Sequence, residues 1–236
     1  MNECVIGGYS LRGTSHIANG LPKQDYVIVK RRRGLVVCVV ADGLGSHRNS
    51  AIGSKCVCEA VLTAANLFRR GITGREQVFL QMVSSIWNCM IYPYSTGECG
   101  STCLLAVRFP DGDIFIAQLG DGAIAYEYDG KIEILSVKDD DFFNLTQSIH
   151  SSQISDWKWK LFRNVREPFR LYMHTDGVNI RSDRAEEFFH AFFDEIDSRK
   201  NRSASEIIRG MLLDIDKSTS DDDMSFACMT INTSRG

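Results

Sequence analysis

The chain has 236 residues, and its 27 lysines and arginines nearly balance its 30 aspartates and glutamates, for a formal net charge of -3. This balance gives no overall attraction to nucleic acid or to an anionic membrane. Hydrophobic residues make up 44% and charged residues 24%, which is typical of folded globular proteins and excludes disordered and fibrous classes. No repeat or low-complexity linker divides the chain, so we expect a single domain over residues 1–236.

The eight cysteines indicate a reducing compartment. Most of them lie in apolar runs such as "VVCVVA" and "STCLLAV", and no CxxC pair occurs. Buried, reduced thiols are therefore the favoured interpretation. The N-terminus has no signal-like region, and no apolar run approaches the ~20 residues of a membrane span. We expect a soluble, cytoplasmic protein.

The first half of the chain alternates between strand and helix signals. Runs rich in Val and Ile predict strands over residues 4–9, 26–31 and 35–41. Apolar residues at helical spacing predict helices over residues 50–70 and 75–90. The four basic residues 30–33 lie between two of the strands, where a solvated turn is favoured over a nucleic-acid patch.

From residue 100 the apolar period changes to two. This predicts an antiparallel meander of four short strands, with tight Asp-Gly turns at Asp111 and Asp129. The polar segment 139–165 is expected to be a surface subdomain or flap, with Trp157 and Trp159 near its end. The four strand runs are 101–109, 113–119, 122–128 and 131–137.

The last third returns to strands and helices. A strand is predicted over 169–175, helices over 184–196 and 204–216, and a final strand over 225–231. Ser203 and Glu206 fit a capping box for the second helix. Strands, two helices, strands, two helices and a strand define an α+β layered domain rather than a βαβ alternation.

Aspartates recur where apolar strands begin or end. Asp42, Asp121 and Asp176 each follow a strand-like run and precede a glycine, while Asp25 and Asp222 come shortly before such runs. One such aspartate alone would be an ordinary turn residue. Five of them, without histidine or cysteine partners, favour a hard cation that prefers oxygen ligands, Mg²⁺ or Mn²⁺.

Six segments occur in the order expected of one family. They are "GLPKQDYVIV", "VVCVVADGLGSHRNSAIGSKCVCEAV", "GECGSTCLLAVRF", "IFIAQLGDGAIAYEYDGKIEILS", "LYMHTDGV" and "SDDDMSFACMTI". Through these segments the chain resembles the metal-dependent serine/threonine phosphatases, the protein phosphatase 2C-like family, in its compact bacterial type, over about residues 7–232. The resemblance implies a four-layer α-β-β-α sandwich of two antiparallel sheets flanked by helix pairs.

The resemblance also implies roles for the aspartates. Asp42 matches an acid that bridges two metal ions, and the carbonyl of Gly43 matches a further ligand of one ion. Asp176 and Asp222 match ligands of the other ion, and Asp223 then takes a position where many relatives have asparagine. Asp25 resembles an acid that holds metal-bound waters, and Asp121 resembles one tied to a third, looser ion. A water shared by two divalent ions would attack the phosphorus.

Three positions depart from the family pattern. Gln24 stands where a glutamate is common, and Leu44 stands where some members have a histidine. For the arginine that binds phosphate in many members, Arg12, His16 and Lys23 are alternatives, and we take Arg12 and His16 as the catalytic candidates beside Asp42.

The expected activity is removal of phosphate from phosphoserine or phosphothreonine in proteins. An inactive pseudophosphatase that binds a phosphoprotein or a kinase is the alternative, and a metal-dependent phosphomonoesterase or nuclease is a third hypothesis. The resemblance implies a phosphorylated protein substrate and hints at a serine/threonine kinase that the enzyme would oppose; we expect a monomer without nucleic-acid or membrane partners.

Overall fold

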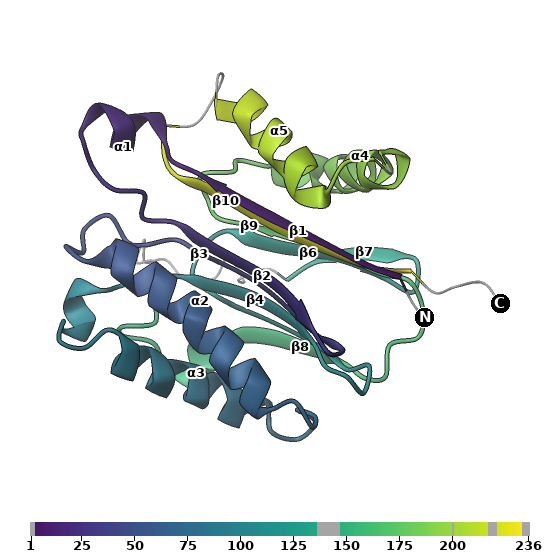
Figure 1. Ribbon diagram of the computed structural model, residues 1–236, viewed down its shortest axis with the longest axis horizontal. Helices are drawn as coiled ribbons and strands as arrows, with labels where there is room; N and C mark the ends of the chain where they lie inside the picture. Colours follow the sequence, from purple (N-terminus) through teal and green to yellow (C-terminus); the bar gives the residue numbers. More distant parts are fainter. Residues whose placement is uncertain (1–2, 136–146, 200, 217–220, 233–236) are drawn as a thin grey trace.

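The computed structural model describes residues 3–135, 147–199, 201–216 and 221–232, and its strands form two five-stranded sheets (Figure 1). Every neighbouring pair of strands is antiparallel. In spatial order, sheet A contains β1 (Glu3–Leu11), β10 (Met224–Asn232), β9 (Phe169–His174), β6 (Ala123–Tyr128) and β7 (Lys131–Ile134). Sheet B contains β2 (Tyr26–Arg32), β3 (Leu35–Ala41), β4 (Cys103–Arg108), β5 (Ile114–Leu119) and β8 (Lys158–Phe162).

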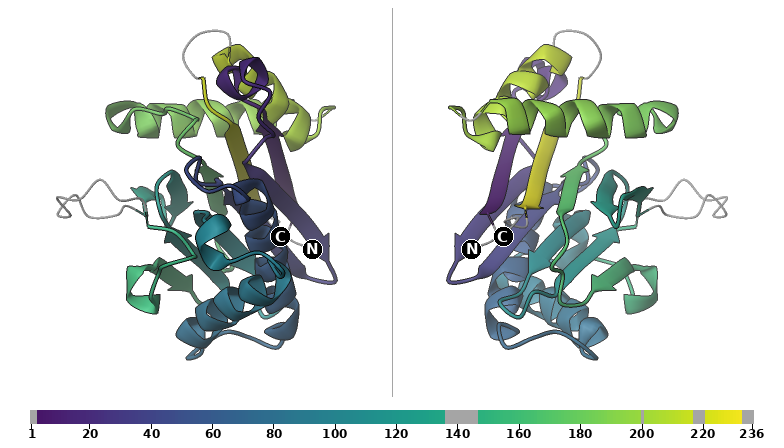
Figure 2. Two further views of the ribbon diagram at one scale, coloured as in Figure 1. Left: turned by 90° about the vertical axis from the view of Figure 1, so that its left-hand side faces the viewer. Right: turned by 90° about the vertical axis from the view of Figure 1, so that its right-hand side faces the viewer.

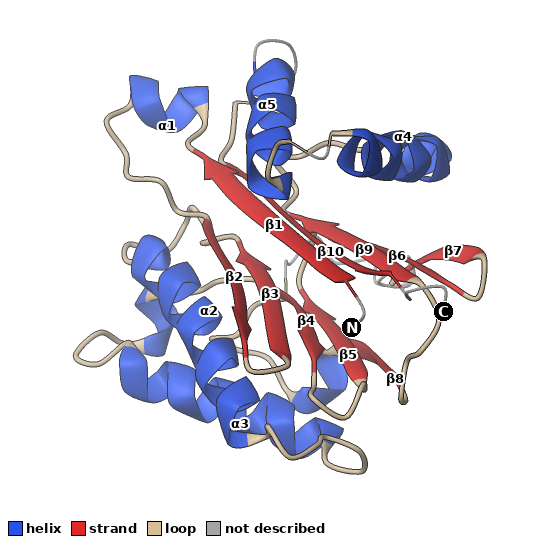
Figure 3. Ribbon diagram, turned by 45° about the vertical axis from the view of Figure 1, so that its right-hand side comes forward, coloured by secondary structure: helices blue, strands red, loops and turns tan. Residues whose placement is uncertain are grey.

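Pairs of helices cover the outer faces of the two sheets (Figures 1 and 3). Helices α2 (Ser50–Leu67) and α3 (Glu76–Met90) pack on sheet B, and α4 (Ala185–Ser198) and α5 (Ala204–Asp216) lie on sheet A. The expected α-β-β-α sandwich is confirmed. The short elements are α1 (Thr14–Ala18) and the 3₁₀ turns Thr96–Glu98, Ile154–Asp156 and Ser182–Arg184.

Strand β3 shows why the layers form. All seven of its residues are buried, so it reads as a continuous apolar run rather than an alternating one. Val36, Cys38 and Val40 pack between the two sheets, whereas Val37 and Val39 pack under α2 and α3. The side chains of successive strand residues point to opposite faces, so one strand serves two cores.

Two sequence expectations were wrong. The four strands after residue 100 do not form one meander, because β4 and β5 pair in sheet B and β6 and β7 pair in sheet A. The segment expected to be a flap contains β8, which joins the edge of sheet B beside β5. Trp157 is buried. Trp159 is 39% exposed, and its ring contacts the ring of Phe115. Residues 139–146, at the start of that segment, lie outside the described residues.

The turns and caps agree with the sequence. Gly112 turns β4 into β5 and Asp129 with Gly130 turns β6 into β7, with positive φ at all three residues. Ser203 and Glu206 form the capping box of α5. All eight cysteines are free thiols. Among the helices in the described part of the chain, none is long and apolar enough to cross a membrane.

Candidate metal site at the strand ends

Three aspartates from different strand ends converge where the two sheets meet. Asp42 follows β3 in sheet B, Asp121 lies in the crossing from β5 to β6, and Asp176 follows β9 in sheet A. One carboxylate oxygen from each lies within 4.8 Å of the other two. Three oxygen ligands at this separation suit a divalent cation such as Mg²⁺ or Mn²⁺. The convergence predicted for these three residues is therefore present.

A fourth carboxyl group, that of Asp25, lies buried beside the three. It is 2% exposed, and Thr175 Oγ1 donates a hydrogen bond to its Oδ2 at 2.7 Å. Its Oδ1 is buried without a hydrogen-bond donor among the described residues. Burial raises the pKa of Asp25 to about 7, although hydrogen bonds with Asp42 and Thr175 work in the opposite direction. A buried carboxylate oxygen that no donor satisfies fits a cation or a cation-bound water.

Burial and crowding of the carboxyl groups also raise the pKa values of two of the converging acids. Burial and repulsion from Asp25, Asp176 and Asp121 raise the pKa of Asp42. Burial and repulsion from Asp121 and Asp222 raise the pKa of Asp176. Neighbouring carboxylates disfavour each other's charge, and a bound cation removes that penalty. The electrostatics therefore fit the metal that the donor set suggests.

The backbone around Asp42 is held on both sides. The Asp42 amide donates to Thr102 Oγ1 at 2.9 Å, and Ser101 Oγ donates to the Asp42 carbonyl at 2.8 Å. Gly43 forms an isolated bridge with Ser101. A Cβ atom on Gly43 would lie 2.7 Å from the Ser50 carbonyl oxygen and 2.8 Å from that of Gln24. Only glycine fits there, which explains why the aspartate is followed by this residue.

The three consecutive acids before β10 have different environments. The Asp222 side chain is 58% exposed, and its charge acts on Asp176. Asp223 is 2% exposed. The Gly13 amide donates to Asp223 Oδ1 at 2.8 Å, and the Gln24 and Asp25 amides donate to its Oδ2 at 2.5 and 3.3 Å. Asp222 is thus exposed and accepts from the Asp223 amide through Oδ1 at 2.7 Å, whereas both oxygens of Asp223 hold backbone amides.

The three candidates for the phosphate contact lie in or beside the loop that Asp223 holds. His16 lies between two acids, with Nδ1 3.0 Å from Asp223 Oδ1 and Nε2 3.6 Å from Asp222 Oδ1. The Arg12 guanidinium donates to the carbonyls of His16 and Leu21. Lys23 donates to Ser10 Oγ at 2.7 Å. Of these three side chains, His16 is the one that contacts a predicted metal ligand.

Sequence reasoning missed the residues that support the acids. Thr175 precedes Asp176 yet binds Asp25, and Ser101 and Thr102 precede β4 yet hold Asp42. Asp223 was noted only for its position. The available signal was polar side chains directly flanking apolar strands, but such residues are common at strand ends and do not identify their partners.

Structural comparison shows the same architecture in several solved proteins. PppA, described as a key regulatory component of T6SS in Pseudomonas aeruginosa, aligns with a TM-score of 0.69 at 15% identity, covering 97% of each chain. The catalytic domain of the serine threonine protein phosphatase PstP, in complex with 2 manganese ions, gives 0.68 at 16% identity, over 98% of this chain and 100% of that one. RsbX in complex with magnesium gives 0.62 at 16% identity with the same coverage. At these identities the likeness concerns the fold.

The sandwich with acids at its strand ends is that of a metal-dependent phosphatase. The protein phosphatase 2C family model matches residues 12–212, so the chain belongs to this family of serine/threonine phosphatases. No curated protein matches the chain in sequence. The resemblance inferred from the six sequence segments is confirmed.

Proposed function

We propose that this chain hydrolyses phosphoserine and phosphothreonine in proteins, using Mn²⁺ or Mg²⁺. The observation that carries the proposal is the convergence of Asp42, Asp121 and Asp176 within 4.8 Å, with the unsatisfied oxygen of Asp25 buried beside them. Family membership and the metal complexes of PstP and RsbX support it.

Each acid has a proposed role. Asp42 and the Gly43 carbonyl would hold one divalent ion, with Asp42 shared with a second. Asp176 and Asp222 would hold that second ion, and Asp121 would hold a third. When bound, the divalent ions lower the pKa of water and neutralise charge on the phosphate oxygens. Asp25 would orient metal-bound water through Oδ1, and Thr175 fixes its carboxyl group by donating to Oδ2.

For the phosphate itself, His16 is the better placed of the two catalytic candidates. Its imidazole lies between two acids, with Nε2 3.6 Å from Asp222 Oδ1 and Nδ1 3.0 Å from Asp223 Oδ1. Arg12 already donates to two carbonyls of the same loop, so its proposed role is to hold that loop in shape.

A phosphothreonine peptide with Mn²⁺ tests the proposal directly. We expect phosphate release that depends on metal and that Asp42→Asn abolishes, with an unchanged circular dichroism spectrum. A purified chain that binds Mn²⁺ without any turnover would instead support the pseudophosphatase alternative. Faster release from nucleotides or DNA than from the peptide would favour a different phosphoesterase.

The setting of this activity is also part of the proposal. We propose one catalytic domain over residues 1–236 that acts as a monomer in the cytoplasm and opposes a serine/threonine kinase. The eight free thiols support a reducing compartment. Light scattering of the purified protein tests the monomer, and localisation by microscopy tests the compartment.

A further inference from the structure

The turn between β2 and β3 and the end of α2 form a concentration of positive charge. We call Lys30, Arg31, Arg32, Arg33, Arg69 and Arg70 the basic corner. Arg69 donates to the carbonyls of Arg32 and Arg33, so α2 and the hairpin are tied together there. Within the described residues, no ion pair includes any of the six. The corner therefore carries six positive charges that no neighbouring carboxylate pairs.

A groove with an apolar floor opens in the basic corner. It has a volume of about 250 Å³ and lies between β2, the edge strand of sheet B, and α2. Leu35, Val37 and Leu62 form its floor, and Lys30 and Arg32 flank it. A site of this composition can bind an apolar side chain and acidic groups at once.

One arginine of the basic corner, Arg33, lies at a backbone position that disfavours most residues with a side chain. Arg33 and Gly34 form the two-residue turn between β2 and β3, with φ of 50° and 82°. Asparagine or glycine suits the first position of such a turn, and another residue there costs of order 1 kcal/mol. Basic residues on an edge strand also prevent unwanted strand pairing, but that role needs neither a charged turn nor an apolar groove.

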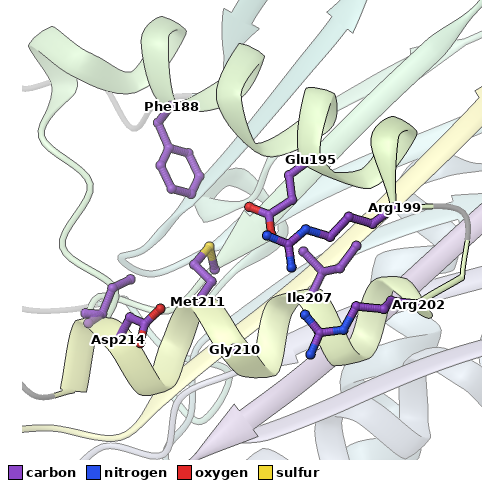
Figure 4. Close-up of a pocket in the computed structure, with 9 residues that line it drawn as sticks. Phe188, Glu195, Arg199, Arg202, Ile207, Gly210, Met211 and Asp214 are labelled. Atoms are coloured by element: carbon purple, nitrogen blue, oxygen red, sulfur yellow. The ribbon is translucent and has the colours of Figure 1, made fainter.

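A larger groove on the other side of the molecule differs in its charges. It lies between α4 and α5 and has a volume of about 470 Å³ (Figure 4). There Arg199 pairs with Glu195 at 3.1 Å, and Asp214 lies on the facing helix (Figure 4). Its charges are balanced, so this groove does not indicate whether a partner would be acidic or basic. The basic corner indicates an acidic partner.

We propose that the basic corner is a docking site for an acidic segment of a partner protein, which places one apolar side chain in the groove. Charge complementarity selects the acidic segment, and the apolar floor selects a peptide over nucleic acid. Non-specific single-strand binding uses aromatic rings on which bases stack, and no aromatic side chain lines this groove among the described residues. Docking here is independent of catalysis, since Asp42 lies at the opposite end of β3.

Fluorescence anisotropy with a labelled acidic peptide tests the docking site. The probe is a short peptide of Glu and Asp around a central Leu-Phe pair. We expect the wild-type chain to bind it and Lys30→Glu/Arg32→Glu to bind it at least about 10-fold more weakly, because two attractive charges become repulsive. The matched control, Lys131→Glu/Arg166→Glu, makes the same change in net charge on exposed residues elsewhere and should alter binding less than about twofold.

The groove itself is tested by two further measurements. Replacing the Leu-Phe pair of the probe with Ser-Gly should weaken binding about fivefold or more, by loss of apolar burial. Asn66→Trp, on the exposed lip of the groove, should block it and weaken the Leu-Phe probe selectively. The proposal is overturned if the wild type binds no better than the charge-reversal variant, or if the Ser-Gly probe binds equally well. A single-stranded oligonucleotide that displaces the peptide at lower concentration would also overturn it.

Discussion

Strand β3 joins two regions of opposite character. It begins at the basic corner and ends, ~20 Å away at ~3.3 Å per residue, at Asp42. The acids at one end are crowded together: Asp25 is buried and takes a hydrogen bond from Thr175, Asp42 is half-buried, and Asp121 and Asp176 are exposed. The bases at the other end are mostly exposed and lack ion pairs with described residues. A formal net charge of -3 conceals both regions, since they nearly cancel.

The two regions differ in crowding and charge, and this difference determines what each can bind. Crowded carboxylates with raised pKa values gain most from a small, highly charged cation that fits between them. Exposed bases gain little from any single contact, and they act together on a large anionic partner, with strong dependence on salt. Five predictions test this contrast, from the largest expected effect to the smallest.

The largest effect should separate the two ends by catalysis. Asp42→Asn should lower Mn²⁺-dependent hydrolysis of p-nitrophenyl phosphate by about a thousand-fold or more, since it removes the negative charge of the proposed central metal ligand. Lys30→Glu/Arg32→Glu should leave this rate unchanged. Equal losses in both variants would show that the two regions do not act independently.

Metal should stabilise the acidic end. At about 100 times its dissociation constant, Mn²⁺ should add about 2.7 kcal/mol to the free energy of unfolding. For a chain of this size that raises Tm by about 5–10 °C. Asp176→Asn should reduce the shift, as measured by differential scanning fluorimetry with and without chelator. An unchanged shift in Asp176→Asn would contradict its proposed role as a ligand.

The neighbouring acids Asp222 and Asp223 should respond in opposite ways. Asp223→Asn replaces one acceptor oxygen, which takes hydrogen bonds from backbone amides, by a donor, so it should cost about 1–3 kcal/mol of stability. Hydrogen exchange at the Gly13 and Gln24 amides should accelerate. Asp222→Asn should leave stability nearly unchanged and lower the activity instead. The reverse pattern would exchange the proposed roles of these two acids.

The metal-free protein should become more stable as the pH falls from about 7.5 to about 5.5. The pKa of Asp25 is raised from 3.8 to about 7 in the folded state, so within this window the folded state holds a proton that the unfolded state has released. Stability is therefore lost as the pH rises toward 7. Urea unfolding in chelator measures the effect, and Asp25→Asn should make the dependence less steep, while Asp42, whose pKa burial also raises, still contributes to it with the same sign. A slope of the opposite sign would contradict the assignment.

The smallest effect concerns the turn of the basic corner. Arg33→Asn should raise the free energy of unfolding by about 0.5–1 kcal/mol, because asparagine tolerates the left-handed conformation better. It should also weaken binding of the acidic probe. Arg32→Asn, at the end of β2 with no left-handed strain to relieve, is the control and should give no such gain. A loss of stability in Arg33→Asn would contradict the inference that the left-handed conformation at this position is unfavourable for arginine.

Sequence patterns predicted the elements better than their assembly. The strand 35–41 has the predicted bounds, because its apolar run is unbroken and ends at an Asp-Gly pair. The division of β4 to β7 between two sheets could not be predicted, because alternation shows that a residue faces a core but not which core. Helix α1 has five residues, none of them buried, and so leaves no apolar period to detect.

The residues of the candidate site, too, could be predicted from the sequence only in part. Asp42, Asp121 and Asp176 were identifiable because each follows an apolar run and precedes a glycine. Asp221, Asp222 and Asp223 are chemically identical in the sequence, and only the amides of Gly13, Gln24 and Asp25 distinguish the last of them. Those amides are about 200 positions away, so no local pattern could assign them.

The position of β10 has a consequence for the order of folding. Sheet B is complete once the chain has reached Phe162, whereas sheet A needs its last strand, Met224–Asn232, between β1 and β9 (Figure 2). Strand β1 therefore pairs with a strand more than 200 residues later in the sequence, as in the pairing of Gly8 with Ala227. Contacts of such separation form late and slowly. During synthesis, sheet B with α2 and α3 can assemble first, and the proposed metal site would be complete only once Asp222 and the strand that follows it, β10, have been added to sheet A.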